Sequence, residues 1–188
     1  MLGSFLLGYL LGALPFGVWI ANMHGVCIFQ VGSGSPGATN VLRTVGKGAG
    51  YTVFVLDALK GTLAVFLGLQ WQSPYVALAG TLLGHSYSCF LHFKGGKGVA
   101  SLIGGLLVLI PLPLLSGLAV WLLIFKISRY VSCASIGFAF SLLPFCCLYE
   151  GISAARFHAL PLFLLSLWVL FRHRANLVRL WQGNENRF

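Results

Sequence analysis

Long apolar runs separated by short polar stretches dominate the sequence. The runs cover Leu2–Met23, Tyr51–Trp71, Tyr75–Phe93, Val99–Phe125, Tyr130–Tyr149 and Phe157–Phe171. Such runs are typical of membrane-spanning helices, because roughly 20 apolar residues cross the hydrocarbon core of a bilayer. With a mean hydropathy of +0.90 and 58% hydrophobic residues, a soluble domain of this size could not bury the apolar surface. The pattern predicts an all-α, polytopic membrane helix bundle, with residues 1–188 forming a single integral-membrane domain.

The first run has its own internal pattern. Ser4, Gly8 and Gly12 are spaced by four residues, which predicts a stripe of small residues for close helix packing. Pro15 and Gly17 are expected to bend this helix. The run has no basic segment before it and no small-residue cleavage site, so we interpret it as a mature span rather than a signal peptide.

The Val99–Phe125 run is too long for one ordinary span and contains Pro111 and Pro113. It is either one kinked span or two short helices folded back at the prolines. If it crosses twice, the chain crosses seven times and most basic segments share one side. Those segments are Ser33–Lys47, Lys94–Gly98, Lys126–Arg129 and the tail, Arg172–Phe188. The cytoplasmic bias of Lys and Arg therefore favours seven crossings, with the N-terminus outside and the C-terminus in the cytoplasm.

Charge and cysteine content argue against several kinds of protein. The chain carries 12 Lys and Arg, only three acids (Asp57, Glu150 and Glu185) and a net charge of +9. The basic residues cluster at the ends of apolar runs, which indicates membrane topology rather than nucleic-acid binding. The five cysteines form no Cys-x-x-Cys pair, and the acids are scattered. The sequence therefore supports neither a disulfide framework nor a metal site.

The first polar stretch, His24–Gly50, is rich in glycine and hydrogen-bond donors. Its Gly32-x-Gly34-x-x-Gly37 pattern matches the dinucleotide fingerprint, but that fingerprint needs an α/β unit that the chain lacks. The donors in this stretch are Ser33, Thr39, Asn40 and Arg43. A long polar segment between spans is usually functional, and an arginine suits bidentate contact with a phosphate.

The lysine–glycine loop, Phe93-Lys94-Gly95-Gly96-Lys97-Gly98, lies between two uncharged apolar runs. Glycines allow the backbone N–H groups to approach an anion, and the lysines add positive charge. A loop of this kind before a helix suits phosphate. A positively charged cytoplasmic turn is an equally simple interpretation of the loop alone.

Ionisable residues also occur inside the runs and in the tail. Asp57 and Lys60 are three apart and can pair on one helix face, either as a functional site or as a structural pair that braces the first polar stretch. We expect His85, in an apolar run, to be a buried histidine with its hydrogen bonds satisfied. His173 and Asn176 lie in the basic, amphipathic tail, which could also be an interfacial helix attracted to anionic lipid.

Taken in order, these motifs resemble the PlsY family of bacterial glycerol-3-phosphate acyltransferases along essentially the whole chain. The matching segments are Gly32–Gly34, Gly37–Arg43, Asp57, Lys60-Gly61, Gly84-His85, Phe93–Ala100 and, in the tail, Arg172-His173, Asn176, Arg179-Leu180, Gly183 and Glu185. The resemblance implies transfer of an acyl group from acyl phosphate to the 1-hydroxyl of glycerol 3-phosphate, which gives lysophosphatidic acid and phosphate in the first committed step of phospholipid synthesis. It further implies no cofactor, a place in the bacterial inner membrane with the site facing the cytoplasm, and a functional link to the enzyme that produces acyl phosphate.

The resemblance also assigns site residues. The implied catalytic set is Ser33, Arg43, Lys94, His173 and Asn176. The implied substrate and phosphate ligands are Gly32, Gly34, Thr39, Asn40, Gly95, Gly96, Lys97 and Gly98, and no metal is implied. The proton of the hydroxyl could be taken by His173 or by a substrate phosphate, and a covalent Ser33 intermediate is the less favoured route.

Some positions depart from the family pattern, and two other function classes remain open at this point. Cys27-Ile28-Phe29 replaces an Asp-x-Arg, Ser35 replaces an asparagine, and Ala175 replaces an acid. These changes bear on substrate affinity or loop rigidity more than on reaction type. The alternatives are a small transporter for an anionic solute and a phosphate-releasing lipid enzyme of another class.

Overall fold

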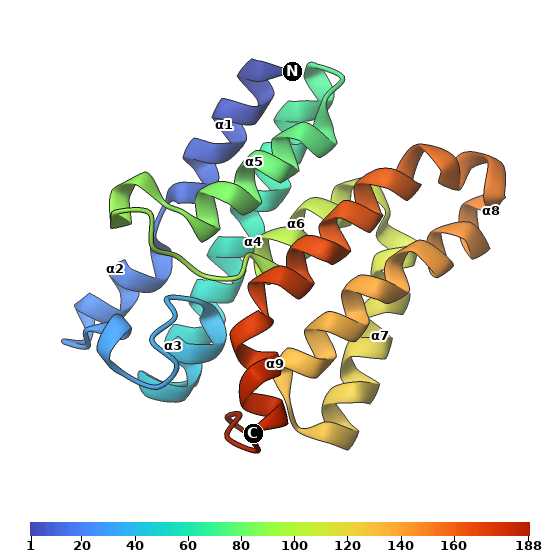
Figure 1. The fold of residues 1–188 in the computed structure, drawn as a ribbon. Coiled ribbons are helices and arrows are strands. Elements are labelled where there is room, and N and C mark those ends of the chain that lie inside the picture. Colours follow the sequence, from blue (N-terminus) through green and yellow to red (C-terminus); the bar gives the residue numbers. More distant parts are fainter. The chain divides into compact units, whose positions relative to one another are not determined.

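The computed structural model describes residues 1–188 apart from the side chain of Ala154, and the elements in this part are helical. The α-helices are α1 Leu2–Ala13, α2 Phe16–Met23, α3 Ala38–Thr44, α4 Lys47–Gln70, α5 Pro74–Ser86, α6 Val99–Leu109, α7 Pro111–Ser128, α8 Val131–Arg172 and α9 Arg174–Trp181 (Figure 1). Two short 3₁₀ helices, η1 Ile28–Gln30 and η2 Cys89–Leu91, lie in the polar stretches. The chain forms two compact units, unit 1 at Met1–Leu109 and unit 2 at Ile110–Phe188. The prediction of an all-helical protein is confirmed.

In unit 1, the predicted bend of the first run is a break between α1 and α2. Leu14 is extended (φ −56°, ψ 119°) and Pro15 follows it outside helical geometry. Proline has no N–H to continue the helical hydrogen bonds, which explains where the break falls. The carbonyl of Leu14 is consequently available to a side chain of another helix.

Contact between α1 and α5 is built from backbone, as the small-residue stripe predicts. A Cβ atom placed on any of four glycines would collide with the main chain of the facing helix. The pairs are Gly8 with Ala77, Gly12 with Thr81, Gly80 with Phe5 and Gly84 with Tyr9. Figure 1 shows the two helices side by side. Small residues let the helices approach closely enough for van der Waals packing to hold them in lipid.

α4 packs against α6, and the N-terminal end of α4 supports the first polar stretch. The Thr62 hydroxyl donates to the carbonyl of Gly104 on α6 at 2.9 Å. Near the start of α4, a small core of Ala21, Ile28, Val41 and Val53 joins α2, η1, α3 and α4. The first polar stretch is therefore held to the bundle by apolar packing.

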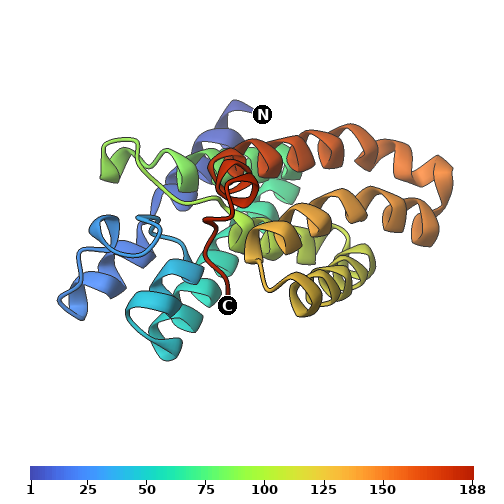
Figure 2. The ribbon, with the colours of Figure 1, turned by 60° about the horizontal axis from the view of Figure 1, so that its bottom comes forward.

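Unit 2 contains α7, α8 and the tail. α8 is a hairpin rather than one straight helix, because Gly151 has a left-handed conformation (φ 76°, ψ 159°) that turns the chain (Figure 2). The two arms are linked where the Ser166 hydroxyl donates to the carbonyl of Ala139 at 2.7 Å. The two predicted runs, Tyr130–Tyr149 and Phe157–Phe171, correspond to these arms.

Five helical stretches have the length and hydropathy to cross a membrane. They are Leu2–Met23, Lys47–Gln70, Pro111–Ser128, Val131–Ser153 and Ala155–Arg172. α5 and α6 have only 13 and 11 residues, so seven crossings and the orientation of the termini stay predictions. Many leucine and phenylalanine side chains are exposed on the long helices, as expected where a helix faces lipid rather than water.

One expected span ends earlier than the sequence predicts, and another divides into two helices, as one of its two predicted alternatives has it. The Tyr75–Phe93 run forms a helix only to Ser86, because the Ser88 hydroxyl donates to the carbonyl of Ala13 at 2.6 Å and draws the chain out of helical geometry. The Val99–Phe125 run contains two helices, α6 and α7, interrupted at Ile110 (φ −144°, ψ 66°) just before Pro111.

Candidate active site

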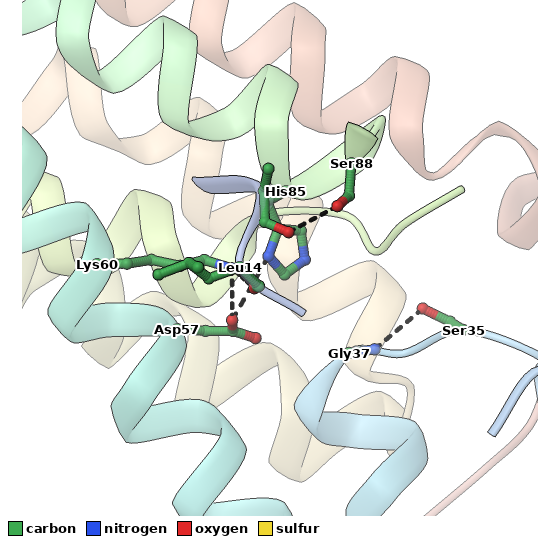
Figure 3. A network of polar contacts seen from close by, with 8 residues as sticks. Leu14, Ser35, Gly37, Asp57, Lys60, His85 and Ser88 are labelled. Atoms are coloured by element: carbon green, nitrogen blue, oxygen red, sulfur yellow. Dashed lines mark hydrogen bonds and ion pairs between the residues drawn. The ribbon is translucent and has the colours of Figure 1, made fainter. Parts of the chain in front are cut away.

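Two buried ionisable side chains, Asp57 and Lys60, meet the partly buried His85 in unit 1. Lys60 Nζ lies 2.7 Å from Asp57 Oδ1, and His85 Nδ1 lies 3.6 Å from the same oxygen. Lys60 also donates to the carbonyl of Leu14 at 3.2 Å, where α1 breaks. Figure 3 shows the side chains of Asp57, Lys60 and His85 converging from α4 and α5. The predicted Asp57–Lys60 pair is confirmed, and its lysine holds the break between α1 and α2.

The lysine–glycine loop packs directly on the end of α5. Gly96 N–H donates to the carbonyl of His85 at 3.1 Å. A Cβ atom on Gly95 would collide with the backbone of His85 and Ser86, and one on Gly96 would collide with the His85 ring. Gly98 has a left-handed backbone (φ 82°), which glycine adopts at low cost. The glycines are required here because the loop lies against a helix end.

Ser88 organises the segment that precedes this loop. Its hydroxyl donates to Ala13 and accepts the Phe90 N–H at 3.2 Å. An isolated antiparallel bridge joins Ser88 to Lys94, and the Lys94 N–H donates to the carbonyl of Leu91 at 3.0 Å. The backbone of Lys94 is thereby fixed while its side chain remains exposed, which suits a cationic group that must meet a ligand.

In the first polar stretch, Asn40 is a buried structural centre. Its side-chain oxygen accepts the Ser33 N–H at 2.9 Å, and its Nδ2 donates to the carbonyl of Val31 at 3.0 Å. Gly32 has a left-handed backbone (φ 58°), and a Cβ atom there would collide with the Asn40 amide. Thr39 and Arg43 lie four residues apart on α3, so they point to the same side of the helix. Asn40 therefore shapes the loop that presents Ser33.

A small pocket borders both polar regions of unit 1. Its lining includes Leu14 and Pro15 from the break, Pro36 from the first stretch, and His85, Ser88 and Leu91 from the base of the lysine–glycine loop. Asp57 and Lys60 also line it. Pro36 is brought there by Gly17 of α2, where a Cβ atom would collide with its carbonyl. The pocket thus brings the first polar stretch next to the segment that leads into the lysine–glycine loop.

In unit 2, the two predicted tail residues are buried and held by local hydrogen bonds. His173 is 1% exposed, and its Nδ1–H donates to the carbonyl of Val169 at 2.7 Å. In a neutral ring this leaves the lone pair on Nε2, the atom that could accept a proton. The Asn176 amide donates to Glu185 Oε1 at 2.6 Å, which orients that amide on α9.

Glu185 is the centre of the tail. Its carboxylate also accepts from Arg179 Nε at 2.8 Å and from the Ser132 hydroxyl at 3.2 Å. Partial burial raises the pKa of Glu185, but the hydrogen bonds from Asn176, Arg179 and Ser132 outweigh burial and hold it below its ordinary value. The tail is therefore tied to the first turn of α8.

The structure changes how several predicted site residues are interpreted. The Gly96 N–H, a predicted phosphate contact, holds the loop on α5 in this structure, so its contact with phosphate stays a prediction. The Asn40 amide likewise braces the loop from within. Sequence reasoning did not identify Ser88 or Glu185 as organising residues. The available signals for Glu185 were its place among the family-matching residues and the scarcity of acids in the chain, whereas a serine such as Ser88 carries no signal in sequence.

Comparisons with known proteins agree over the whole chain. The profile of the family described as glycerol-3-phosphate acyltransferase matches residues 2–183. The glycerol-3-phosphate acyltransferase of Thermosipho melanesiensis is 42% identical over 187 residues, covering 98% of this chain and 90% of its own. That of Aquifex aeolicus is 40% identical, covering 96% of this chain and 95% of its own.

Two solved structures share the fold. Crystal structures of PlsY (YgiH), an integral membrane glycerol 3-phosphate acyltransferase, align with TM-scores of 0.90 in the glycerol 3-phosphate form and 0.88 in the lysophosphatidic acid form. Each is 37% identical and covers 100% of this chain and 94% of its own. The similarity therefore extends from sequence to three-dimensional arrangement.

Proposed function

The chain belongs to the glycerol-3-phosphate acyltransferase family, and from this membership we propose that it uses a fatty acyl phosphate as donor. The 1-hydroxyl oxygen of sn-glycerol 3-phosphate attacks the carbonyl carbon of the acyl phosphate. An ester C–O bond forms, the bond from the carbonyl carbon to the phosphate oxygen breaks, and inorganic phosphate leaves. The organic product is lysophosphatidic acid.

The observation that carries this proposal is the lysine–glycine loop at the end of α5. Its backbone is fixed by Gly96 and Ser88 while the Lys94 side chain remains exposed. A cation carried on a backbone that is held in place can stabilise charge that develops on a leaving phosphate and on a carbonyl oxygen, with less reorganisation at the moment of reaction. The first polar stretch borders the same pocket through Pro36 and supplies Arg43 as a second cation.

The roles follow from the chemistry of each side chain. Arg43 and Lys94 bind the two phosphates, assisted by Gly32, Gly34, Thr39, Gly95, Lys97 and Gly98. Ser33 and Asn176 orient the substrates for attack. Either His173, through Nε2, or a substrate phosphate removes the hydroxyl proton. A change of pH optimum in His173→Gln, with residual activity, favours His173 as the base.

We propose that residues 1–188 act as a single acyltransferase domain, because the family profile matches residues 2–183. We also propose a bacterial inner-membrane location, with the active site on the cytoplasmic side and lipid as the source and sink of acyl chains. The donor proposed here links the protein functionally to whichever enzyme makes acyl phosphate. Nucleic acid has no role.

The decisive experiment compares acyl donors on purified protein. Palmitoyl phosphate and glycerol 3-phosphate are expected to give lysophosphatidic acid and phosphate in equal amounts, without added metal. The physical reason is that a small anion site at helix ends can hold a phosphate, whereas the large carrier of a CoA ester needs a docking surface. Turnover with palmitoyl-CoA and none with palmitoyl phosphate contradicts the proposal.

Orientation is tested separately by cysteine labelling in intact cells. In a background without native cysteines, a cysteine in the tail at Asn186 is expected to resist a membrane-impermeant reagent until the cells are opened. A cysteine at Ser153, an exposed position, provides the contrast, because seven crossings place residues 150–156 outside. Labelling of the tail site from outside contradicts the seven-crossing arrangement.

A further inference from the structure

Three potential metal ligands meet at the turn of the α8 hairpin. Glu150 Oε2 lies 3.5 Å from Cys146 Sγ and 3.2 Å from His158 Nε2. One thiol sulfur, one carboxylate oxygen and one imidazole nitrogen all lie within 4.8 Å of one another. Cys146 is buried, while the side chains of Glu150 and His158 are 28% and 23% exposed. The cluster therefore has a buried sulfur and an opening to solvent.

The hairpin explains how these side chains come together. Cys146 and Glu150 are four residues apart on the first arm of α8, so they lie on one face. Gly151 reverses the chain, and the second arm brings His158 back to that face. Sequence spacing alone did not indicate a metal site, because it matches no common zinc pattern and depends on a turn made by a single glycine.

We propose that Cys146, Glu150 and His158 bind one divalent transition-metal ion, with Zn²⁺ as the best-fitting metal. Zinc accepts sulfur, nitrogen and oxygen ligands together in a tetrahedron. Its bond lengths of about 2.3 Å to sulfur and about 2.0–2.1 Å to nitrogen and oxygen place neighbouring S···O and N···O atoms about 3.5 and about 3.3 Å apart. The observed separations of 3.5 and 3.2 Å match both edges.

The electrostatic setting supports a cation. In the part of the chain that the structure describes, Asp57 accepts from Lys60 and Glu185 accepts from Arg179. Glu150 instead faces the Cys146 thiol and the His158 imidazole. A metal ion that coordinates the Cys146 sulfur and the Glu150 carboxylate offsets the negative charge of both ligands. The ion displaces the thiol proton on binding.

Three protein ligands leave a fourth position for water, and the two arms of α8 supply ligands from either side of Gly151. The ion therefore closes the hairpin, so metal binding stabilises unit 2. This proposal does not depend on the acyltransferase reaction.

The test uses purified, tag-free, full-length protein, reduced and stripped of metal, in detergent. Titration with Co²⁺ alone is expected to produce a near-ultraviolet thiolate-to-cobalt charge-transfer band that saturates at one ion per chain. Zn²⁺ is expected to abolish the band by displacement. A wild-type protein without the band, under conditions where it is folded, overturns the proposal.

Variants locate the site. Cys146→Ser should remove the band, whereas Cys147→Ser, at the next residue, is the matched control and should retain it. His158→Gln should weaken binding by at least about 100-fold, more than the loss of an outer-shell partner. Zn²⁺ should raise the unfolding temperature of the wild type but not of His158→Gln, which tests the site even if Cys146→Ser folds poorly. An unchanged band in Cys146→Ser, or equal thermal shifts in wild type and His158→Gln, contradicts the assignment.

Discussion

Lys60 and Asp57 form a buried ion pair of 2.7 Å on one face of α4, and the lysine reaches further to the backbone carbonyl of Leu14. Each side chain is only 3% exposed. The pair therefore links α4 to the point where the first transmembrane helix breaks. Because Asp57 also faces His85, the same carboxylate is connected to the helix end that carries the lysine–glycine loop.

Removing one member of this pair is expected to destabilise the protein severely. Asp57→Asn leaves the Lys60 ammonium buried without its counter-charge, which costs about 3–5 kcal/mol in the free energy of unfolding. The measurement is reversible unfolding in mixed detergent. Lys47→Met, at the exposed start of α4, is the control and should change little. The double variant Asp57→Leu/Lys60→Met removes both charges and should recover part of the lost free energy of unfolding. If the double variant is as unstable as Asp57→Asn, the ion pair itself contributes net stability.

Gly96→Ala is expected to weaken substrate binding by displacing the lysine–glycine loop. The new methyl group collides with the His85 ring, so the loop must shift and carry Lys94 with it. Steady-state kinetics should show a raised KM for glycerol 3-phosphate or acyl phosphate. Gly48→Ala provides the matched control, because nothing lies within 4 Å of a Cβ atom at that position. Equal kinetics for the two variants would disprove the tight packing of the loop.

Lys94→Ala and Arg43→Ala are each expected to reduce kcat/KM by the equivalent of about 2–4 kcal/mol, the scale for losing a preorganised donor to developing charge. Activity is measured at matched protein levels in the membrane. Arg156→Ala, an exposed arginine in the second arm of α8, should keep full activity. If all three variants lose activity together at normal expression, the charges serve membrane insertion rather than chemistry.

Acid should destabilise the tail through Glu185. The pKa of this carboxyl is lowered in the folded protein, so its contribution to stability is present above the ordinary pKa of 4.5. That contribution is lost as the pH falls through the lower, folded pKa. Glu185→Gln removes it at every pH, so the difference in unfolding temperature between wild type and variant should be large at neutral pH and shrink below pH 4.5. A difference that does not change with pH would contradict the role of the carboxylate in the network.

Local pattern was enough to predict the helices, the break near Pro15 and the stripe of glycines on α1, since each depends on neighbouring residues. The pairing of Asp57 with Lys60 was also predictable, because helical spacing places them together. The end of α5 at Ser86 could not be predicted from sequence, because it depends on a hydrogen bond from Ser88 to Ala13, which is far away in the chain. The internal roles of Asn40 and Gly96 were hidden for the same reason. A polar side chain or N–H group in a glycine-rich loop can serve a ligand or the loop itself, and only its hydrogen-bond partner tells which.

The two faces of α1 differ in how much substitution they can tolerate, because only one of them forms the backbone contact with α5. Four glycines carry the packing, and a larger side chain at any of them would collide with the facing backbone. The outer face of α1 takes no part in that contact, and Leu6 and Leu10 on it are about half exposed, at 50% and 53%. These outer positions can change in bulk and length as membrane thickness and fluidity differ between habitats. Substitutions on the outer face of α1 can therefore adapt the enzyme to a new lipid composition without changing the packing between α1 and α5.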